Sequence, residues 1–161
     1  MAEIEAKLER MGLSLPGPFV PPTGLTLPFK PIIVRGSHVY LAGHAPQQAN
    51  GMAAEPLGKV GQELTVEQGY EAARLVALSM LGTLKREIGD LDRVVSWLRV
   101  FGMVNVAPGF TATTPVINGF SDLIVELYGP ERGAHTRSAV GMAVLPLNLP
   151  VEVEAEVEIA V

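Results

Sequence analysis

The chain has 161 residues with no cysteine, 48% hydrophobic and 18% charged residues, and a formal net charge of −5 at pH 7. This composition excludes disordered and fibrous proteins, and the missing cysteines exclude a disulfide scaffold, a thiolate zinc site and a cysteine nucleophile. The balance of 12 basic against 17 acidic residues argues against a nucleic-acid partner, because affinity for phosphates comes mostly from Lys and Arg.

The N-terminal part predicts a short helix followed by an extended arm. Ile4, Leu8 and Met11 recur at helical spacing, which predicts a helix over residues 2–11. Residues 13–31 are rich in proline, which fixes φ and removes a backbone donor, so this arm should form no regular element. Its leucines and phenylalanines make it too apolar for a free linker. We therefore expect the arm to lie against the body or a neighbouring subunit.

The cellular location is predicted from the absence of a recognisable secretory signal and of a membrane helix in the sequence. The acidic start, Met-Ala-Glu-Ile-Glu-Ala-Lys, has no apolar segment typical of a secretory signal. No apolar run approaches the roughly 18 residues that a membrane helix needs. We therefore expect a cytoplasmic protein with no membrane partner.

The next elements are a hairpin and a long helix. Two β-prone runs, residues 32–35 and 38–42, flank a Gly-Ser pair, which predicts a β-hairpin. Thr65 followed by Gln68 three residues later is a capping box, the usual start of a helix. The apolar stripe that follows predicts a helix over residues 65–88.

The second half predicts one strand, one helix and two more strands. Residues 93–106 are rich in β-branched and aromatic side chains with little polar alternation, which favours a strand covered on both faces. The dipeptide Thr114-Pro115 predicts the start of a helix that ends at Gly129-Pro130. Residues 136–145 and 151–161 then predict two strands, the second with strict alternation.

This order of elements indicates an α+β layer of two helices on one sheet. If the last two strands formed a hairpin around residues 146–150, Arg137 and Glu152 would lie roughly 23 Å apart along it. One pocket could then use both residues only if they came from different subunits, or if the strands paired in another way.

Arg137 is the main candidate for binding an anion. On a strand it shares one face with Ala139, Gly141 and Ala143, so its guanidinium would lie beside a hollow left by tiny residues. The planar fork of an arginine matches a carboxylate in two parallel hydrogen bonds. The alternative is an arginine at a strand start that pairs with a surface acid, and the spacing alone leaves both open.

Glu152 begins a row of four glutamates on one face of the last strand. Like charges about 7 Å apart favour a solvated face, but Glu152 lies nearest the preceding turn, where a loop or partner could enclose it. His38, His44 and His135 show no metal-ligand spacing, so we expect no metal site. His44 ends a strand, and His135 shares the face of Arg137.

Several motifs in order resemble the RidA/YjgF/UK114 family. The run from His135 to Pro146, followed by Val-Glu-Val-Glu-Ala, is similar to the family's C-terminal signature. The stretch Val39-Tyr-Leu-Ala-Gly-His-Ala-Pro resembles its second strand. Three further pieces are similar to the longer branch, called endoribonuclease L-PSP or chorismate-mutase-like: Gly58-Lys-Val-Gly, Val104-Asn-Val-Ala-Pro-Gly-Phe and Val116-Ile-Asn-Gly-Phe-Ser-Asp-Leu.

The resemblance covers about residues 28–161 and implies a chorismate-mutase-like (YjgF/RidA) α+β fold. In that fold one mixed sheet is packed by two main helices on one face, and three copies form a homotrimer with clefts between subunits. Residues 1–27, the N-terminal helix and proline-rich arm, are extra to the short members. The implied activity is hydrolysis of reactive 2-imino acids to 2-keto acids and ammonia, without a cofactor.

The resemblance also assigns roles to individual residues. Arg137 matches the arginine that binds the substrate carboxylate, and Glu152 matches the glutamate that holds the attacking water. Gly43 matches the backbone that lines the pocket, and Asn118 matches the asparagine at the helix start.

Three candidate binding residues depart from the short members. Phe29 stands where they carry a pocket tyrosine, His44 where they carry glutamine, and Ala139 where cysteine is common. Phe29 has no hydroxyl, so the substrate preference can differ. We interpret the small residues Ala139 and Gly141 as room for a short substrate side chain.

Two other functions stay open at this point. A protein that only binds 2-keto acids or similar carboxylates would use the same Arg137 pocket without turnover. A ribonuclease is suggested by the label of the longer branch, although the net charge of −5 and the missing basic stripe argue against it.

Overall fold

The computed structural model describes residues 3–161 and contains the predicted elements in the predicted order. The N-terminal helix is described from residue 3, so residue 2 of its predicted span lies outside the described residues. The bounds are α1 Glu3–Arg10, β1 Ile32–Arg35, β2 His38–His44, α2 Val66–Ile88, β3 Val94–Asn105, α3 Thr113–Arg132, β4 Thr136–Met142 and β5 Val151–Ile159, with 3₁₀ turns η1 Leu91–Arg93 and η2 Pro146–Asn148.

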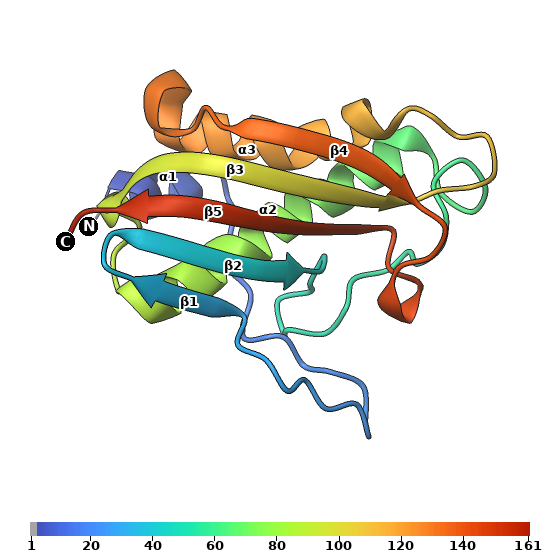
Figure 1. The fold of residues 1–161 in the computed structure, drawn as a ribbon, viewed down its shortest axis with the longest axis horizontal. Helices are drawn as coiled ribbons and strands as arrows, with labels where there is room; N and C mark the ends of the chain where they lie inside the picture. Colours follow the sequence, from blue (N-terminus) through green and yellow to red (C-terminus); the bar gives the residue numbers. More distant parts are fainter. Residues whose placement is uncertain (1–2) are drawn as a thin grey trace.

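The five strands form one mixed sheet in the order β1-β2-β5-β3-β4 (Figure 1). β3 and β4 are parallel because α3 crosses between them, and the other neighbours are antiparallel. The predicted hairpin of the last two strands is wrong, since β4 and β5 lie on opposite sides of β3. In this register Val100 of β3 is paired with Arg137 of β4, and Met103 of β3 is paired with Glu152 of β5.

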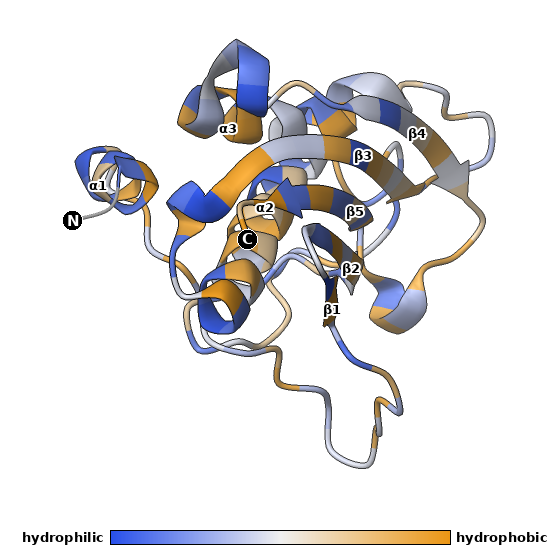
Figure 2. Ribbon diagram, turned by 60° about the vertical axis from the view of Figure 1, so that its left-hand side comes forward, coloured by the Kyte–Doolittle hydropathy of each residue, from blue (hydrophilic) through white to orange (hydrophobic). Residues whose placement is uncertain are grey.

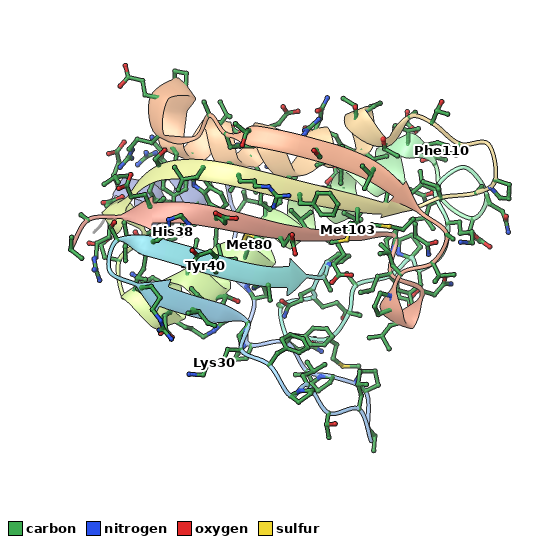
Figure 3. The ribbon with its side chains drawn as sticks, viewed as in Figure 1. Lys30, His38, Tyr40, Met80, Met103 and Phe110 are labelled. Carbon is green, nitrogen blue, oxygen red and sulfur yellow. The ribbon has the colours of Figure 1, made fainter. Side chains whose placement is uncertain are left out.

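The two faces of the sheet differ. α2 and α3 pack on one face (Figure 2), where the odd-numbered residues of β5 and Trp97 of β3 are buried. The glutamates of β5 lie on the opposite, open face, together with Phe101, which pairs with Glu154. Tyr40 and Met103, labelled in Figure 3, lie on the same face. β3 was predicted to be covered on both faces. In the single chain this is wrong, because Phe101 and Met103 are only half-buried.

The long helices begin and end for local reasons. The Thr65 side chain accepts from the Gln68 backbone N–H while the Gln68 side chain accepts from Thr65 N–H, which confirms the predicted capping box. The predicted start of α3, with Thr114 as cap and Pro115 as first helical residue, is two residues late: the cap is Ala112 and the helix begins at Thr113, whose hydroxyl donates to Ala139 O at 3.0 Å and ties the helix to β4. Gly129, at φ 78°, breaks α3 one turn before its end.

The N-terminal helix is part of the body. Ile4 and Leu8 are buried in the main core, and the Asp92 carboxylate accepts from the backbone N–H groups of Glu3 and Ile4 at 2.6 and 3.0 Å. This carboxylate therefore satisfies donors that the first turn of α1 leaves free.

The proline-rich arm is held at its start and then projects from the body (Figure 1). Gly17 N–H donates to Ala49 O and Val20 N–H to Gly51 O, while Leu25, Leu27 and Phe29 farther along are exposed. The arm thus rests on the body over its first part only. Over residues 3–161, none of the helices combines the length and apolar composition that a bilayer crossing requires.

Candidate functional site

Four of the predicted site residues line one cavity: Phe29, Gly43, His44 and Glu152. The cavity has a volume of about 690 Å³, within the range of roughly 300–1,000 Å³ that small-molecule sites occupy. The arm, the end of β2, the last turn of α2 and the η2 segment enclose it. Most of its wall is apolar, contributed by Pro18, Phe19, Leu25, Leu27, Pro31, Ile32, Leu147 and Leu149.

A β-bulge places two of these residues. Leu41 pairs with Ala155 and His44 with Val153, so β2 has one residue more than β5 in this interval. The extra residue turns the His44 side chain to the helix side of the sheet, where it meets α2. Gly43 is left facing Glu152 on the other side.

Glu152 fits against Gly43 because a glycine has no side chain. A Cβ on Gly43 would lie 2.1 Å from Glu152 Oε1 and 2.9 Å from its Cδ. Partial burial raises the pKa of Glu152 above its usual value, and the nearby charge of Glu154 raises it further. A carboxyl with a raised pKa exchanges protons more readily near neutral pH, which is what general acid–base catalysis requires.

His44 is only 6% exposed and is fixed by two hydrogen bonds. Its Nδ1 lies 2.6 Å from Ala42 O and its Nε2 lies 2.9 Å from Thr83 Oγ1. Burial lowers the pKa of His44, and the charge of Arg86 lowers it further, so the ring is neutral at pH 7. Arg86 donates to Thr83 Oγ1 at 3.1 Å and to Pro16 O at 3.0 Å.

Thr83 and Arg86 also line the cavity, and sequence reasoning did not find them. They lie one turn apart near the end of α2, and nothing in the local sequence distinguishes them from other residues of the helix. Their role depends on the buried histidine that β2 brings to them, which no local pattern reveals.

Arg137 lies elsewhere, on the edge strand β4 and on the helix side of the sheet. Its Nη1 donates to Ser121 Oγ of α3 at 3.0 Å. Partial burial lowers the pKa of Arg137, and Asp122 opposes this shift. Asn118 is one helical turn before Ser121 on α3, and Ala139 is two residues after Arg137 on its face, so these predicted residues form a second group with Arg137.

The predicted hollow beside Arg137 is filled at Gly141. A Cβ on Gly141 would lie 2.9 Å from Val106 Cγ2, and Ala139 packs against the core. Ala143 lies beyond the end of β4. The small residues therefore admit neighbours of the same chain, and the interpretation of Ala139 and Gly141 as room for a substrate side chain is wrong for Gly141.

Within one chain Arg137 and Glu152 cannot share a pocket. They lie on strands that flank β3, on opposite faces of the sheet: Arg137 is on the side of Val100, and Glu152 is on the side of Met103. β4 and β5 do not form the predicted hairpin, but their actual positions on either side of β3 do not bring Arg137 and Glu152 together. A site that uses both needs two copies of the chain.

One acidic cluster in the described residues has a spacing that could suit a cation: Glu5, Asp90 and Asp92. Each already has protein partners. Lys85 forms an ion pair with Glu5, Asp90 accepts from the backbone N–H of Asp92, and Asp92 caps α1. These contacts give the cluster a structural role at the junction of α1 and η1.

Comparison with known proteins places the chain in a family. A family model described as "YjgF/chorismate mutase-like, putative endoribonuclease" matches residues 5–157. Protein TCP17 of Trypanosoma cruzi is 37% identical over 156 residues, covering 97% of this chain and 94% of that protein.

Two solved structures are similar over almost their whole length. The Agrobacterium tumefaciens protein Atu1372, of unknown function, is 34% identical with a TM-score of 0.85, covering 98% of this chain and 94% of that one. A Shewanella oneidensis MR-1 protein that carries the same endoribonuclease description is 31% identical with a TM-score of 0.86, covering 97% and 99%. The motifs, the sheet and these matches agree, and the chain belongs to the YjgF/chorismate mutase-like family.

Proposed function

We propose that this protein hydrolyses reactive 2-imino acids to 2-keto acids and ammonia, in sites shared between two copies of the chain. One copy supplies the cavity with Glu152 and Gly43, and the other supplies Arg137 with Asn118 and Ala139. The observation that carries the proposal is the Glu152 carboxyl, half-buried against Gly43 at the edge of an apolar cavity. The family resemblance of Arg137 and Glu152 supports the same assignment.

The chemistry asks little of the protein. The imine carbon is already electrophilic, so the site has to anchor, orient and move protons. Arg137 holds the substrate carboxylate by two hydrogen bonds from its planar fork. Anchoring converts a chance encounter into a positioned one.

Glu152 moves the protons. Its carboxylate takes a proton from water while the water oxygen bonds to the imine carbon and the C=N electron pair moves to nitrogen, and the Glu152 carboxyl then gives that proton to the nitrogen. In the resulting tetrahedral adduct Glu152 passes the hydroxyl proton to the amino nitrogen, so that the C–N bond breaks, the nitrogen leaves as ammonia and the oxygen forms the keto group. Each water consumed yields one keto acid and one ammonia, and acid–base help of this kind is worth about 10²–10⁴-fold.

Because Arg137 and Glu152 would come from different copies of the chain, the shared site can be tested by mixing variants. Imines are generated with an amino-acid oxidase, and the protein is assayed by the loss of semicarbazide-trapped imine. Arg137→Ala and Glu152→Gln should each lose the acceleration. When the two inactive variants are unfolded, mixed and refolded together, about a quarter of the sites in a closed ring regain both wild-type residues, so activity should return.

The outcomes separate the candidate functions. Activity that returns on mixing supports shared sites in a homotrimer, whereas an unchanged rate in Arg137→Ala removes Arg137 from the mechanism. Binding of a 2-keto acid without any turnover in the wild type would indicate a carboxylate-binding protein instead.

The family description favours RNA cleavage as a second candidate function. Against it stand the net charge of −5 and the row of glutamates on the open face, since RNA binding relies on basic surfaces. RNA cleavage that accompanies the purified protein and disappears in Arg137→Ala would support the ribonuclease.

A further inference from the structure

Arg137 is the first member of a chain of hydrogen bonds. Its Nη1 lies 3.0 Å from Ser121 Oγ, which lies 2.8 Å from His135 Nε2. The other ring nitrogen, His135 Nδ1, lies 2.7 Å from Gly133 O. These hydrogen bonds thus connect β4, through Ser121 of α3, to the turn that joins α3 to β4.

The partners assign a direction to each bond. A carbonyl oxygen only accepts, so His135 Nδ1 carries the proton and donates to Gly133 O. In the neutral ring Nε2 is then an acceptor, and the Ser121 hydroxyl donates to it. The Ser121 oxygen keeps a lone pair for Arg137, whose guanidinium can only donate. Each of the three hydrogen bonds therefore has one donor and one acceptor.

A second chain of the same kind lies at the cavity. Arg86 donates to Thr83 Oγ1, which lies 2.9 Å from His44 Nε2 and, at the longer distance of 3.3 Å, also from Ser79 O, and His44 Nδ1 lies 2.6 Å from Ala42 O. In both chains the histidine bonds the carbonyl of the residue two positions before it. The recurrence of arginine, hydroxyl, histidine and carbonyl at both halves of the proposed site indicates a way of fixing a guanidinium.

We propose that Ser121 and His135 are positioning residues that hold the Arg137 guanidinium ready for the carboxylate of the ligand. This inference rests on the proposed function of Arg137 as the carboxylate anchor. Within residues 3–161 Ser121 is the hydrogen-bond partner of the guanidinium and occupies one N–H of Nη1, so the other donors can bind a ligand. Without the hydroxyl, binding would have to order a free arginine side chain, which weakens affinity by about three- to tenfold.

The chain also makes binding depend on pH. A protonated His135 would donate from Nε2, so Ser121 would face two donors, and a second cation would lie beside Arg137. Arg137 on β4 is the charged group that acts on the ring, while Asp122 on α3 acts on Arg137 and accepts a hydrogen bond from Tyr70 on α2. Burial lowers the pKa of His135 below its usual 6.5, with a further contribution from Arg137, so the loss of affinity should occur below that pH.

The test measures the affinity of a 2-keto acid, 4-methyl-2-oxopentanoate, by calorimetry between about pH 5 and pH 8. In the wild type the affinity should fall toward low pH. Ser121→Ala should bind about three- to tenfold more weakly at pH 8 and His135→Asn should lose the acidic limb, while Ser121→Thr, which keeps the hydroxyl, should restore wild-type binding. Thr136→Val is the matched control, since it removes a β4 hydroxyl that donates to Leu98 O rather than to the hydrogen bonds of Arg137.

The results distinguish this inference from the proposed function. If Arg137→Ala weakens binding but Ser121→Ala and His135→Asn bind as the wild type does at every pH, the positioning role is overturned and Arg137 stays the anchor. If Arg137→Ala binds as the wild type does, the anchor itself is wrong, and the inference falls with it. Circular dichroism of each variant identifies any loss of affinity that comes from unfolding.

Discussion

Gly43→Ala tests whether the position of the Glu152 carboxyl matters. The new Cβ would lie 2.1 Å from Glu152 Oε1, and ordinary contact begins at about 3.4 Å, so the carboxyl has to move by about 1.3 Å. The atom in the way is the far end of a flexible side chain, and the φ of Gly43 is not in the left-handed region, so the fold can accommodate the alanine. A misplacement of about 1 Å can cost about 10²-fold in rate, which corresponds to about 2.7 kcal/mol of transition-state stabilisation.

The assay is imine hydrolysis with an amino-acid oxidase, accompanied by thermal unfolding. We expect kcat/KM to fall about 10²-fold with little change in Tm. Gly17→Ala is the matched control, because a Cβ there would meet only Ala49 O, at 3.8 Å. The double variant Gly43→Ala, Glu152→Gln should be no slower than Glu152→Gln alone, since both changes act on one carboxyl. A folded Gly43→Ala enzyme with the full wild-type rate would refute the reasoning.

Three further predictions follow from the same structure. The apolar cavity wall should favour imines of leucine over those of alanine by at least about tenfold in kcat/KM, and Phe29→Ala should reduce this ratio; equal rates for both substrates would contradict it. The raised pKa of Glu152 means that the folded state binds its proton more tightly, so the stability present below about pH 4.5 is lost as pH rises through the folded pKa; Tm measured against pH should show this loss in the wild type and not in Glu152→Gln. Gly119→Ala would place a Cβ 2.0 Å from Tyr70 O of the facing helix and should destabilise the fold by about 3 kcal/mol in denaturant unfolding, and a change below 1 kcal/mol would show that the helices can separate freely.

Local chemistry made several elements predictable from the sequence. The capping box at Thr65 depends on residues three apart, and the hairpin of β1 and β2 depends on a two-residue turn. The end of α2 at Gly89 follows from a residue that tolerates positive φ. In each case the atoms that decide the structure are neighbours in the chain.

The pairing of β4 could not be predicted in this way. Whether β4 lies beside β5 or on the far side of β3 is decided by the packing of α3 on the sheet, which a pattern of alternating residues does not contain. The start of α3 was missed for a related reason, because Thr113 bonds Ala139 O across the fold and no local cap signals it.

The candidate site also contains residues that the sequence identifies and residues that it does not. Arg137 and Glu152 were identified by a family resemblance, and their surroundings were not. Ser121 bonds Arg137 from 16 residues away, and Thr83 bonds His44 from 39 residues away. Such partners are set by the tertiary structure, so residue types in the sequence do not single them out.

The bulge in β2 acts as a frameshift in the alternation of the strand. Up to Leu41 every second residue faces α2, and if the same residues continued as a regular strand without a bulge, Gly43 would face the helices while His44 would point to the open side. Removing one residue at Ala42 or Gly43 would remove the bulge but leave His44 paired with Val153, so the imidazole would still lie on the helix side of the sheet. The bulge therefore lets β2 carry one residue more than β5 while His44 keeps the side it would have in a regular strand that is one residue shorter. Straightening β2 at its present length would instead exchange what the two sides of the sheet present.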